Sequence, residues 1–346
     1  MPPIVPSRRA VLAGLAGLSL APSAALAQRA GATPPPVGIE VAARRIETFS
    51  RTSSERRFGR LEFRGGLVLN SSHKDFGGFS GLIVEPDGRR FMAISDEGGW
   101  LTGEIAYERS APFGVRSARM GRILGLGGRA LARKRDQDAE GLALISGNLT
   151  QGEVLIAFER NHRVARHPIT NGVLMPPIGL LRMPPEARRM RSNTGLEALA
   201  ILQGGPHKGA VVAICENFPD TNGLHVGWIW TGADPRQFTF REANGFDVTD
   251  AAGLPDGSLL VLERRFRWSE GVKMQLRLLP QKAVAPGATG GAADMLLAAD
   301  MSYEIDNMEG LAVHRGPRGE TVLTMISDDN FNHLLQRTIL LQFTLS

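Results

Sequence analysis

The chain has 346 residues, of which 40 are Lys or Arg and 35 are Asp or Glu. The formal net charge is +5, or +3 without Arg8 and Arg9, which is too small to indicate a nucleic-acid partner, and the single cysteine, Cys215, excludes an internal disulfide. Beyond the N-terminus no run approaches the ~18 consecutive apolar residues of a membrane-spanning helix, so no integral membrane segment is expected there.

The N-terminus has the pattern of an export signal. The stretch "SRRAVLAGLAGLSLAPSAALA" joins Arg8 and Arg9 to a short apolar run and a small-residue cleavage site at Ala25-Leu26-Ala27. This predicts a twin-arginine-type signal peptide over residues 1–27 and a periplasmic or secreted protein, with an ordinary secretory peptide as the alternative. We expect residues 28–59 to be an N-terminal segment, partly linker, and residues 60–346 to be a single domain.

Five segments of that domain repeat one plan: a small or acidic residue, Gly or Ala with Leu, a turn, an apolar run and a polar cluster. They begin at "FSGLIVEPDG", "AEGLALISGN", "LEALAILQGG", "TDAAGLPDG" and "MEGLAVHRG". The anchor residues Ser80, Glu140, Glu197, Asp250 and Glu309 are spaced by 60, 57, 53 and 59 residues. Such regular spacing indicates a repeat architecture.

Each repeat is predicted to form four short strands. Two apolar runs flank a turn such as Pro86-Asp87-Gly88, and a third, alternating strand and a fourth segment follow. The last repeat has three predicted strands. The segment "RLEFRGGLVLN", ahead of the first repeat, can supply its fourth strand. This predicts an all-β fold, a β-propeller of five or six four-stranded blades closed by N- and C-terminal strands. The segment "GIEVAARRIETF" would complete a sixth blade, so the number of blades stays open.

The acidic residues of the repeats are expected to converge. In an antiparallel hairpin, the start of the first strand and the end of the second lie at the same edge of the sheet. In a propeller the first strands line the central channel, so these acids surround one mouth. The candidate metal ligands are Asp96, Glu97, Glu140, Glu159, Glu197, Glu216, Asp250, Glu263, Glu309 and Asp328.

So many neighbouring carboxylates repel one another unless a cation neutralises them. Oxygen ligands, with Asn161, Asn217 and Asn330 beside the acids and no Cys or His cluster, favour Ca²⁺, and Mg²⁺ and Mn²⁺ remain alternatives. The other explanation is that each acid caps the turn before its strand. That explanation is weaker for Glu than for Asp, and weaker for the whole set than for one residue.

At these residues the chain resembles the phytase-like family, "esterase-like activity of phytase". The resemblance rests on "GGFSGL…ISDEGG", "DAEGLAL", "GLEALA" and "NMEGLA…ISDDN", and it covers roughly Phe63 to Leu345. It implies a propeller more securely than a reaction. By analogy with propeller phytases, it also implies calcium ions at one face that hold phosphate and activate water.

The resemblance suggests a metal-dependent hydrolase of phosphoesters. With the export signal, we expect an exported protein that acts on a small-molecule substrate as a monomer. Candidate catalytic residues are Glu140, Glu197, Glu309 and Asp96. Candidate phosphate-binding residues are Lys74, Arg160, His162, Arg264 and Arg265, each of which is also explained as an ordinary loop charge. The competing hypotheses are a calcium-dependent lactonase or carboxylesterase and a non-catalytic binding propeller with a structural ion.

Overall fold

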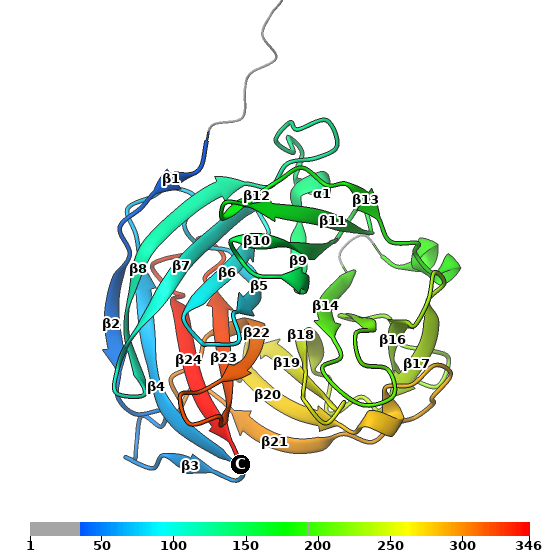
Figure 1. Ribbon diagram of the computed structural model, residues 1–346. Helices are drawn as coiled ribbons and strands as arrows, with labels where there is room; N and C mark the ends of the chain where they lie inside the picture. Colours follow the sequence, from blue (N-terminus) through cyan, green and yellow to red (C-terminus); the bar gives the residue numbers. More distant parts are fainter. Residues whose placement is uncertain (1–34, 192–193) are drawn as a thin grey trace, which may run out of the picture. The chain divides into compact units, whose positions relative to one another are not determined.

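The computed structural model describes residues 35–191 and 194–346, which form five antiparallel sheets in chain order (Figure 1). Each sheet is one blade, numbered along the chain. The predicted export signal, residues 1–27, lies outside the described residues.

The strands of each blade are given from the innermost strand outward. Blade 1 contains β5 (Phe79–Val84), β6 (Arg90–Ser95), β7 (Gly99–Glu108), β8 (Ala111–Arg122) and β1 (Val37–Gly38). Blade 2 contains β9 (Ala139–Gly147), β10 (Gln151–Phe158), β11 (Arg163–Thr170), and both β12 (Val173–Leu174) and β13 (Gly179–Leu180) paired with β11. Blade 3 contains β14 (Leu196–Ile201), β15 (Val211–Cys215), β16 (His225–Trp230) and β17 (Arg236–Phe240). Blade 4 contains β18 (Asp247–Gly253), β19 (Leu259–Arg267), β20 (Gly271–Leu279) and β21 (Asp294–Ala299). Blade 5 contains β22 (Asn307–Arg315), β23 (Thr321–Asp328), β24 (Thr338–Leu345), β4 (Leu61–Asn70), β2 (Ala42–Ile46), and β3 (Arg57–Phe58) on β4. The short helices are α1 (Lys134–Gln137) and the 3-10 turns Pro185–Arg189 and Gln281–Ala283.

The five innermost strands close into a ring. Strands β5, β9, β14, β18 and β22 each contact the next one, and β22 returns to β5. Figure 1 shows them around the middle of the five sheets. The fold is a five-bladed β-propeller, which confirms the predicted fold class. In the described part of the chain there is no sixth blade, because residues 37–46 instead add β1 and β2 to the outer edges of blades 1 and 5.

The ring is closed by strands from opposite ends of the domain. Strand β4 pairs antiparallel with β24, from Leu61 opposite Leu345 to Leu69 opposite Thr338. The prediction that "RLEFRGGLVLN" completes the last blade is therefore confirmed. Strands β1, β2 and β3 lie in the segment 28–59 that sequence analysis separates from the propeller, and all three pair with propeller strands. They cover edges that would otherwise expose unpaired backbone groups.

Apolar side chains between neighbouring blades hold the ring together. Between blades 1 and 2, for example, Ile94 and Trp100 lie in one buried cluster with Ile156 and Phe158. All four side chains are at most 1% exposed. The blades are therefore joined by packing, as expected for a chain without a disulfide.

Every innermost strand has a β-bulge near its start. The bulged residues are Ser80, Glu140, Glu197, Thr249 and Glu309. The residue after the bulge is glycine in three of the blades, where neighbouring inner strands approach closely. A Cβ atom on Gly141 would lie 2.7 Å from the Glu197 carbonyl oxygen and 2.8 Å from Leu199 Cβ. The "Glu-Gly-Leu" of the repeat thus combines a bulged position with one that the ring geometry restricts.

Substituting this glycine should therefore destabilise the ring. We expect Gly141→Ala to lower the free energy of unfolding by about 1–3 kcal/mol, because the added methyl group overpacks the contact with β14. Urea unfolding measures this change. Gly114→Ala in β8 is the matched control, since a Cβ atom there meets nothing within 4 Å, and its effect should stay below about 0.5 kcal/mol. Equal effects of the two substitutions would contradict this role of Gly141.

No helix of the described residues is both long and apolar enough to cross a membrane.

Candidate functional site

Side chains from all five blades meet at the edge of the ring where the bulges lie. The second strand of each blade reaches this edge because it runs antiparallel to the first. The residues in register there are Asp96, Glu159, Glu216, Arg264 and Asp328. Asp138, just before β9, also lies at this edge, where its carbonyl accepts the Glu159 N–H. We call eight of the carboxylates at this edge the acidic mouth: Asp96, Asp138, Glu140, Glu159, Glu197, Glu216, Glu309 and Asp328.

Blade 4 departs from the predicted pattern by one residue. The bulge falls on Thr249 and not on Asp250, and the residue facing Asp247 at the end of the hairpin is Arg264 and not Glu263. A basic residue therefore occupies the position that an acid holds in the other four blades. The sequence pattern matches "TDAAGL" to "EGLAL" acid to acid, whereas the backbone matches Thr249 to Glu140.

The two acids predicted for blade 4 have structural partners instead. The buried carboxylate of Asp250 accepts backbone N–H bonds from Leu311 at 2.7 Å and Ala251 at 2.8 Å, so it links β18 to β22. Glu263 is fully buried and accepts bonds from Arg277 Nε at 2.8 Å and Gln275 Nε2. Neither carboxylate belongs to the acidic mouth.

Three cationic side chains partly neutralise the mouth. Arg264 Nε lies 2.7 Å from Glu309 Oε1, and its NH2 lies 3.5 Å from Glu216 Oε1. Arg160 binds the Asp138 carboxylate through Nε. Lys134 Nζ, from α1, lies 2.6 Å from Asp96 Oδ2 and 2.8 Å from Asp138 Oδ1. Eight carboxylates thus surround three cations, which leaves an excess of negative charge.

Two groups of three carboxylates have the spacing of a cation site. Asp138, Glu140 and Glu159 form one group, and Glu159, Glu197 and Glu216 form the other. Within each group one oxygen of every residue lies within 4.8 Å of the others. Ca²⁺ binds oxygen at 2.3–2.6 Å, so two ligands of one ion are at most about 5 Å apart. Glu159 is shared by the two groups, which makes it the central residue of the mouth.

The pKa values of four carboxylates in the acidic mouth are raised above their ordinary range. Burial, opposed by the Gly195 N–H bond, raises the pKa of Glu159 to about 7. Burial also raises the pKa of Glu216 to about 7, although Arg264 opposes the shift. The pKa values of Glu140 and Glu197 rise well above the ordinary range through burial and through repulsion by neighbouring carboxylates. Strongly shifted acids that converge in one place are characteristic of functional sites.

The sequence has a clear family match. The model of the phytase-like family, described as "Esterase-like activity of phytase", matches residues 74–331. The chain belongs to this family. The matched region includes every residue of the acidic mouth, from Asp96 to Asp328, and it assigns the protein to the hydrolase-type propellers.

Solved structures resemble this phytase-like protein only distantly. The PQQ-bound aldose sugar dehydrogenase from Streptomyces coelicolor is 14% identical with a TM-score of 0.41, over 81% of this chain and 98% of that chain. The endo-arabinase from Bacteroides thetaiotaomicron VPI-5482 is 9% identical with a TM-score of 0.46, over 78% of this chain and 93% of that chain. None of the curated proteins compared with the chain matches it. The activities of the two enzymes therefore say nothing about the activity here.

The donor set of this phytase-like mouth fits a hard divalent cation. All the donors in the two groups are carboxylate oxygens, which suit Ca²⁺, Mg²⁺ or Mn²⁺. Asp96 Oδ1 is in addition buried without a hydrogen-bond partner, although Oδ2 of the same side chain binds Lys134. Asn161, Asn217 and Asn330, which were expected beside the acids, direct their amides to Asp136, Asp247 and Gln336.

The remaining predicted residues lie around the mouth or away from it. Glu97 is half-exposed and lies 3.1 Å from Lys134 Nζ, while Lys74 is exposed in the loop before β5. His162 Nε2 lies 2.9 Å from the Arg191 carbonyl oxygen. Arg265 points away from the mouth, with NH2 at 2.7 Å from Glu270 and its guanidinium over the Phe246 ring. Of the five predicted phosphate-binding residues, only Arg160 and Arg264 contact acids of the mouth.

Sequence analysis missed Asp138 and Lys134. Asp138 lies two residues before Glu140, and strand alternation would have placed the two acids on one side of the strand. Lys134 lies in the connection between blades 1 and 2, and nothing in the sequence pattern indicates that this loop turns back over Asp96. The approach of Lys134 depends on tertiary folding alone.

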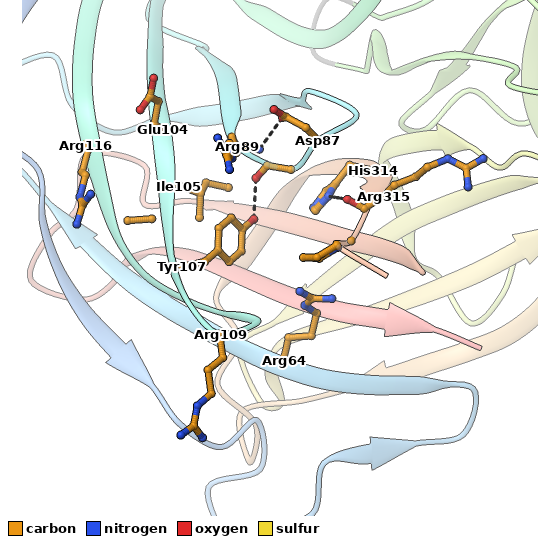
Figure 2. Close-up of a pocket in the computed structure, with 14 residues that line it drawn as sticks. Arg64, Asp87, Arg89, Glu104, Ile105, Tyr107, Arg109, Arg116, His314 and Arg315 are labelled. Atoms are coloured by element: carbon orange, nitrogen blue, oxygen red, sulfur yellow. Dashed lines mark hydrogen bonds between the residues drawn. The ribbon is translucent and has the colours of Figure 1, made fainter. Parts of the chain in front are cut away.

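A separate cavity lies at the opposite end of the strands. It has a volume of about 650 Å³ and is lined by the turns 87–89 and 314–317 together with Arg64 and Tyr107 (Figure 2). Arg64 binds Glu320 at 2.7 Å, and the Tyr107 hydroxyl donates to the Gly88 carbonyl at 2.7 Å. No carboxylate of the acidic mouth lines this cavity. The convergent, mutually perturbed acids therefore identify the mouth as the candidate site.

Proposed function

We propose that the acidic mouth binds a divalent cation. The proposed ion is calcium, with Mg²⁺ and Mn²⁺ as alternatives. We further propose that the exported protein hydrolyses phosphoesters at this site. The observation that carries this proposal is the sharing of Glu159 by two groups of three carboxylates. Asp138, Glu140 and Glu159 would hold one ion, and Glu197 and Glu216 complete the second group. When bound, a cation of this kind supplies a Lewis acid for a phosphoryl oxygen and lowers the pKa of a water molecule.

The chain's own residues support the reaction in three ways. Lys134 fixes the carboxylate of Asp96 through Oδ2, and Asp96 is the candidate proton acceptor for a nucleophilic water. Burial raises the pKa of Asp96, which favours its role as a proton acceptor. Arg160 contacts Asp138 through Nε and remains 41% exposed, so its guanidinium is open to a substrate phosphate.

Hydrolysis assays with and without a chelator test the proposal. We expect cleavage of p-nitrophenyl phosphate that is lost in EDTA and restored by calcium. Cleavage of p-nitrophenyl butyrate or a small lactone, without cleavage of the phosphate, would instead support a carboxylesterase or lactonase, which the family description "esterase-like" favours. If none of the three is cleaved while calcium still raises the thermal midpoint, the protein is a binding propeller.

Export is tested separately, because it depends on the N-terminal signal alone. Replacing Arg8 and Arg9 together by lysine should retain the protein in the cytoplasm of a bacterium that has the twin-arginine route. Cell fractionation measures the distribution. Unchanged export of this variant would favour an ordinary secretory signal.

The stabilisation by calcium should increase with pH. Glu159 and Glu216, with pKa values raised to about 7, keep protons in the ion-free folded state that the unfolded chain releases near pH 4.5. The ion-free protein therefore loses stability as the pH rises through 7, and calcium competes with fewer protons there. We expect the rise in thermal midpoint caused by calcium to be larger at pH 8 than at pH 6.

The difference in thermal midpoint with and without calcium, taken at each pH, is independent of the buried histidines. Burial lowers the pKa values of His167, His225 and His314 to about 4, so they make the folded state more stable as the pH rises towards 6.5. Their contribution is the same with and without calcium, and it cancels in the difference between the two midpoints. A calcium effect that decreases from pH 6 to pH 8 would contradict the assignment of these acids.

A further inference from the structure

The hairpin between β19 and β20 exposes two aromatic side chains. Trp268 is 94% exposed and Phe266 is 50% exposed, and their rings form an edge-to-face pair with centroids 5.3 Å apart. The other three tryptophans, Trp100, Trp228 and Trp230, are at most 6% exposed. Such large rings normally lie in a core or against a ligand, so their exposure as a pair suggests a binding surface.

The pair belongs to the hairpin at the mouth end of blade 4. Arg264 lies at the mouth, and β19 continues past it to Arg267, beyond the start of β18. Alternate residues of a strand share a face, so Phe266 lies on the same face as Arg264 and about 7 Å farther along the strand. Arg265, the residue between them, faces the other way and donates a hydrogen bond to the Asn244 carbonyl.

Ion pairs join the two strands at the base of the hairpin. Glu270 lies 2.7 Å from Arg265 NH2, 3.2 Å from Arg267 NH1 and 2.5 Å from Lys273 Nζ. These ion pairs join both sides of the turn, and they leave the aromatic rings in solvent. Aromatic side chains have only two rotatable χ angles, so they lose little conformational entropy when they bind a ligand.

Other exposed apolar side chains lie in loops beside blades 4 and 5. Leu334 is 96% exposed and Leu335 is 82% exposed in the loop from β23 to β24, and Met301, 43% exposed, precedes β22. Both loops lie at the same end of the strands as the acidic mouth. Met301 also lies against Gly271, the first residue of β20. We call Phe266, Trp268, Met301, Leu334 and Leu335 the apolar rim.

We propose that the apolar rim binds an aromatic or alkyl part of the substrate while the hydrolysed group lies in the acidic mouth. The short distance from Phe266 to Arg264 along one strand face favours a single amphiphilic molecule that reaches both. This inference rests on the proposed function for the position of the reacting group. The substrate class is therefore an ester with an apolar substituent.

Fluorescence of Trp268 tests binding without any need for turnover, because the other tryptophans are buried. The probes are 4-phenylbutanol, phenylphosphonate and methylphosphonate, with the full chain as wild type and as Glu159→Gln. We expect both ring-containing probes to shift the emission of Trp268 to shorter wavelength and to protect it from acrylamide quenching, in both proteins. Phenylphosphonate should bind the wild type about 10-fold more tightly than methylphosphonate in calorimetry.

Two variants complete the test. Trp268→Ala should remove the roughly 10-fold preference for the phenyl group. Ile178→Ala, at a side chain 63% exposed beside β13, should keep it. Binding of 4-phenylbutanol without binding of either phosphonate would reject the phosphoester function. It would still support the binding of an apolar group at the apolar rim. If no ring-containing probe changes the emission of Trp268, or if only vesicles of phosphatidylcholine and phosphatidylglycerol do, the proposal is overturned.

Discussion

Replacing Glu159 by glutamine should lower the affinity for calcium by at least about 100-fold and abolish calcium-dependent hydrolysis. Glu159 is the one carboxylate that belongs to both candidate ligand groups, so its loss affects both at once. The change should leave the fold intact. Its Oε1 accepts the Gly195 N–H at 3.2 Å, and a glutamine carbonyl can accept the same bond.

Glu153→Gln is the matched control for this prediction. Glu153 is also in β10, but it lies at the opposite end of the strand and pairs with Arg166 NH2 at 2.8 Å. Its substitution should change calcium affinity and hydrolysis less than about 2-fold, because the side chain lies far from the acidic mouth and its ion pair is partly exposed. Calorimetry of the chelator-treated proteins measures both affinities. Wild-type affinity in Glu159→Gln would show that the ion does not bind at the shared carboxylate.

Replacing Arg264 by methionine should destabilise the ion-free protein by about 3 kcal/mol or more. The side chain is 25% exposed and its partner Glu309 only 6%, so the substitution leaves a buried carboxylate without its cation. Calcium should recover part of this loss, since a bound cation replaces the missing charge. Urea unfolding with and without calcium measures both effects. The double variant Arg264→Met with Glu309→Gln should be more stable than Arg264→Met alone, because it removes the unpaired charge.

Arg277→Met distinguishes this effect from the loss of any buried ion pair. Arg277 binds Glu263 inside blade 4 and away from the mouth, and both side chains are at most 4% exposed. Its replacement should also destabilise the protein by about 3 kcal/mol, but calcium should not restore the loss. Equal recovery of both variants by calcium would contradict a role for Arg264 as the counter-ion of the mouth.

The blades were predictable from the sequence because they repeat. The errors of the prediction concern single positions. The spacing of Glu140, Glu197 and Glu309 indicates a repeated blade and the edge where acids meet, with five or six blades open. Blade 4 was misaligned by one residue, because Asp250 is acidic and follows Thr249, and small residues on either side of it fit two alignments. A β-bulge, which sequence does not reveal, decides between them by placing Thr249 at the mouth.

Other features depend on contacts that no local pattern encodes. Strands β1 and β2 are short, exposed edge strands, and their place is determined by the partners β8 and β4 that they cover. The bond from Lys134 to Asp96 depends on how a loop turns back over the ring. The acidic mouth was therefore predictable as a group, but its internal cations were not.

A crystal structure with Mn²⁺, measured at the manganese absorption edge, tests the central claim most directly. Mn²⁺ accepts the same oxygen ligands as calcium and gives an anomalous signal that locates it. We predict an anomalous peak bonded to the Glu159 carboxylate together with Asp138 and Glu140, with Glu197 and Glu216 on its other side. A mouth in which these acids bind only Lys134, Arg160, Arg264 and water, with no peak among them, would contradict the cation site.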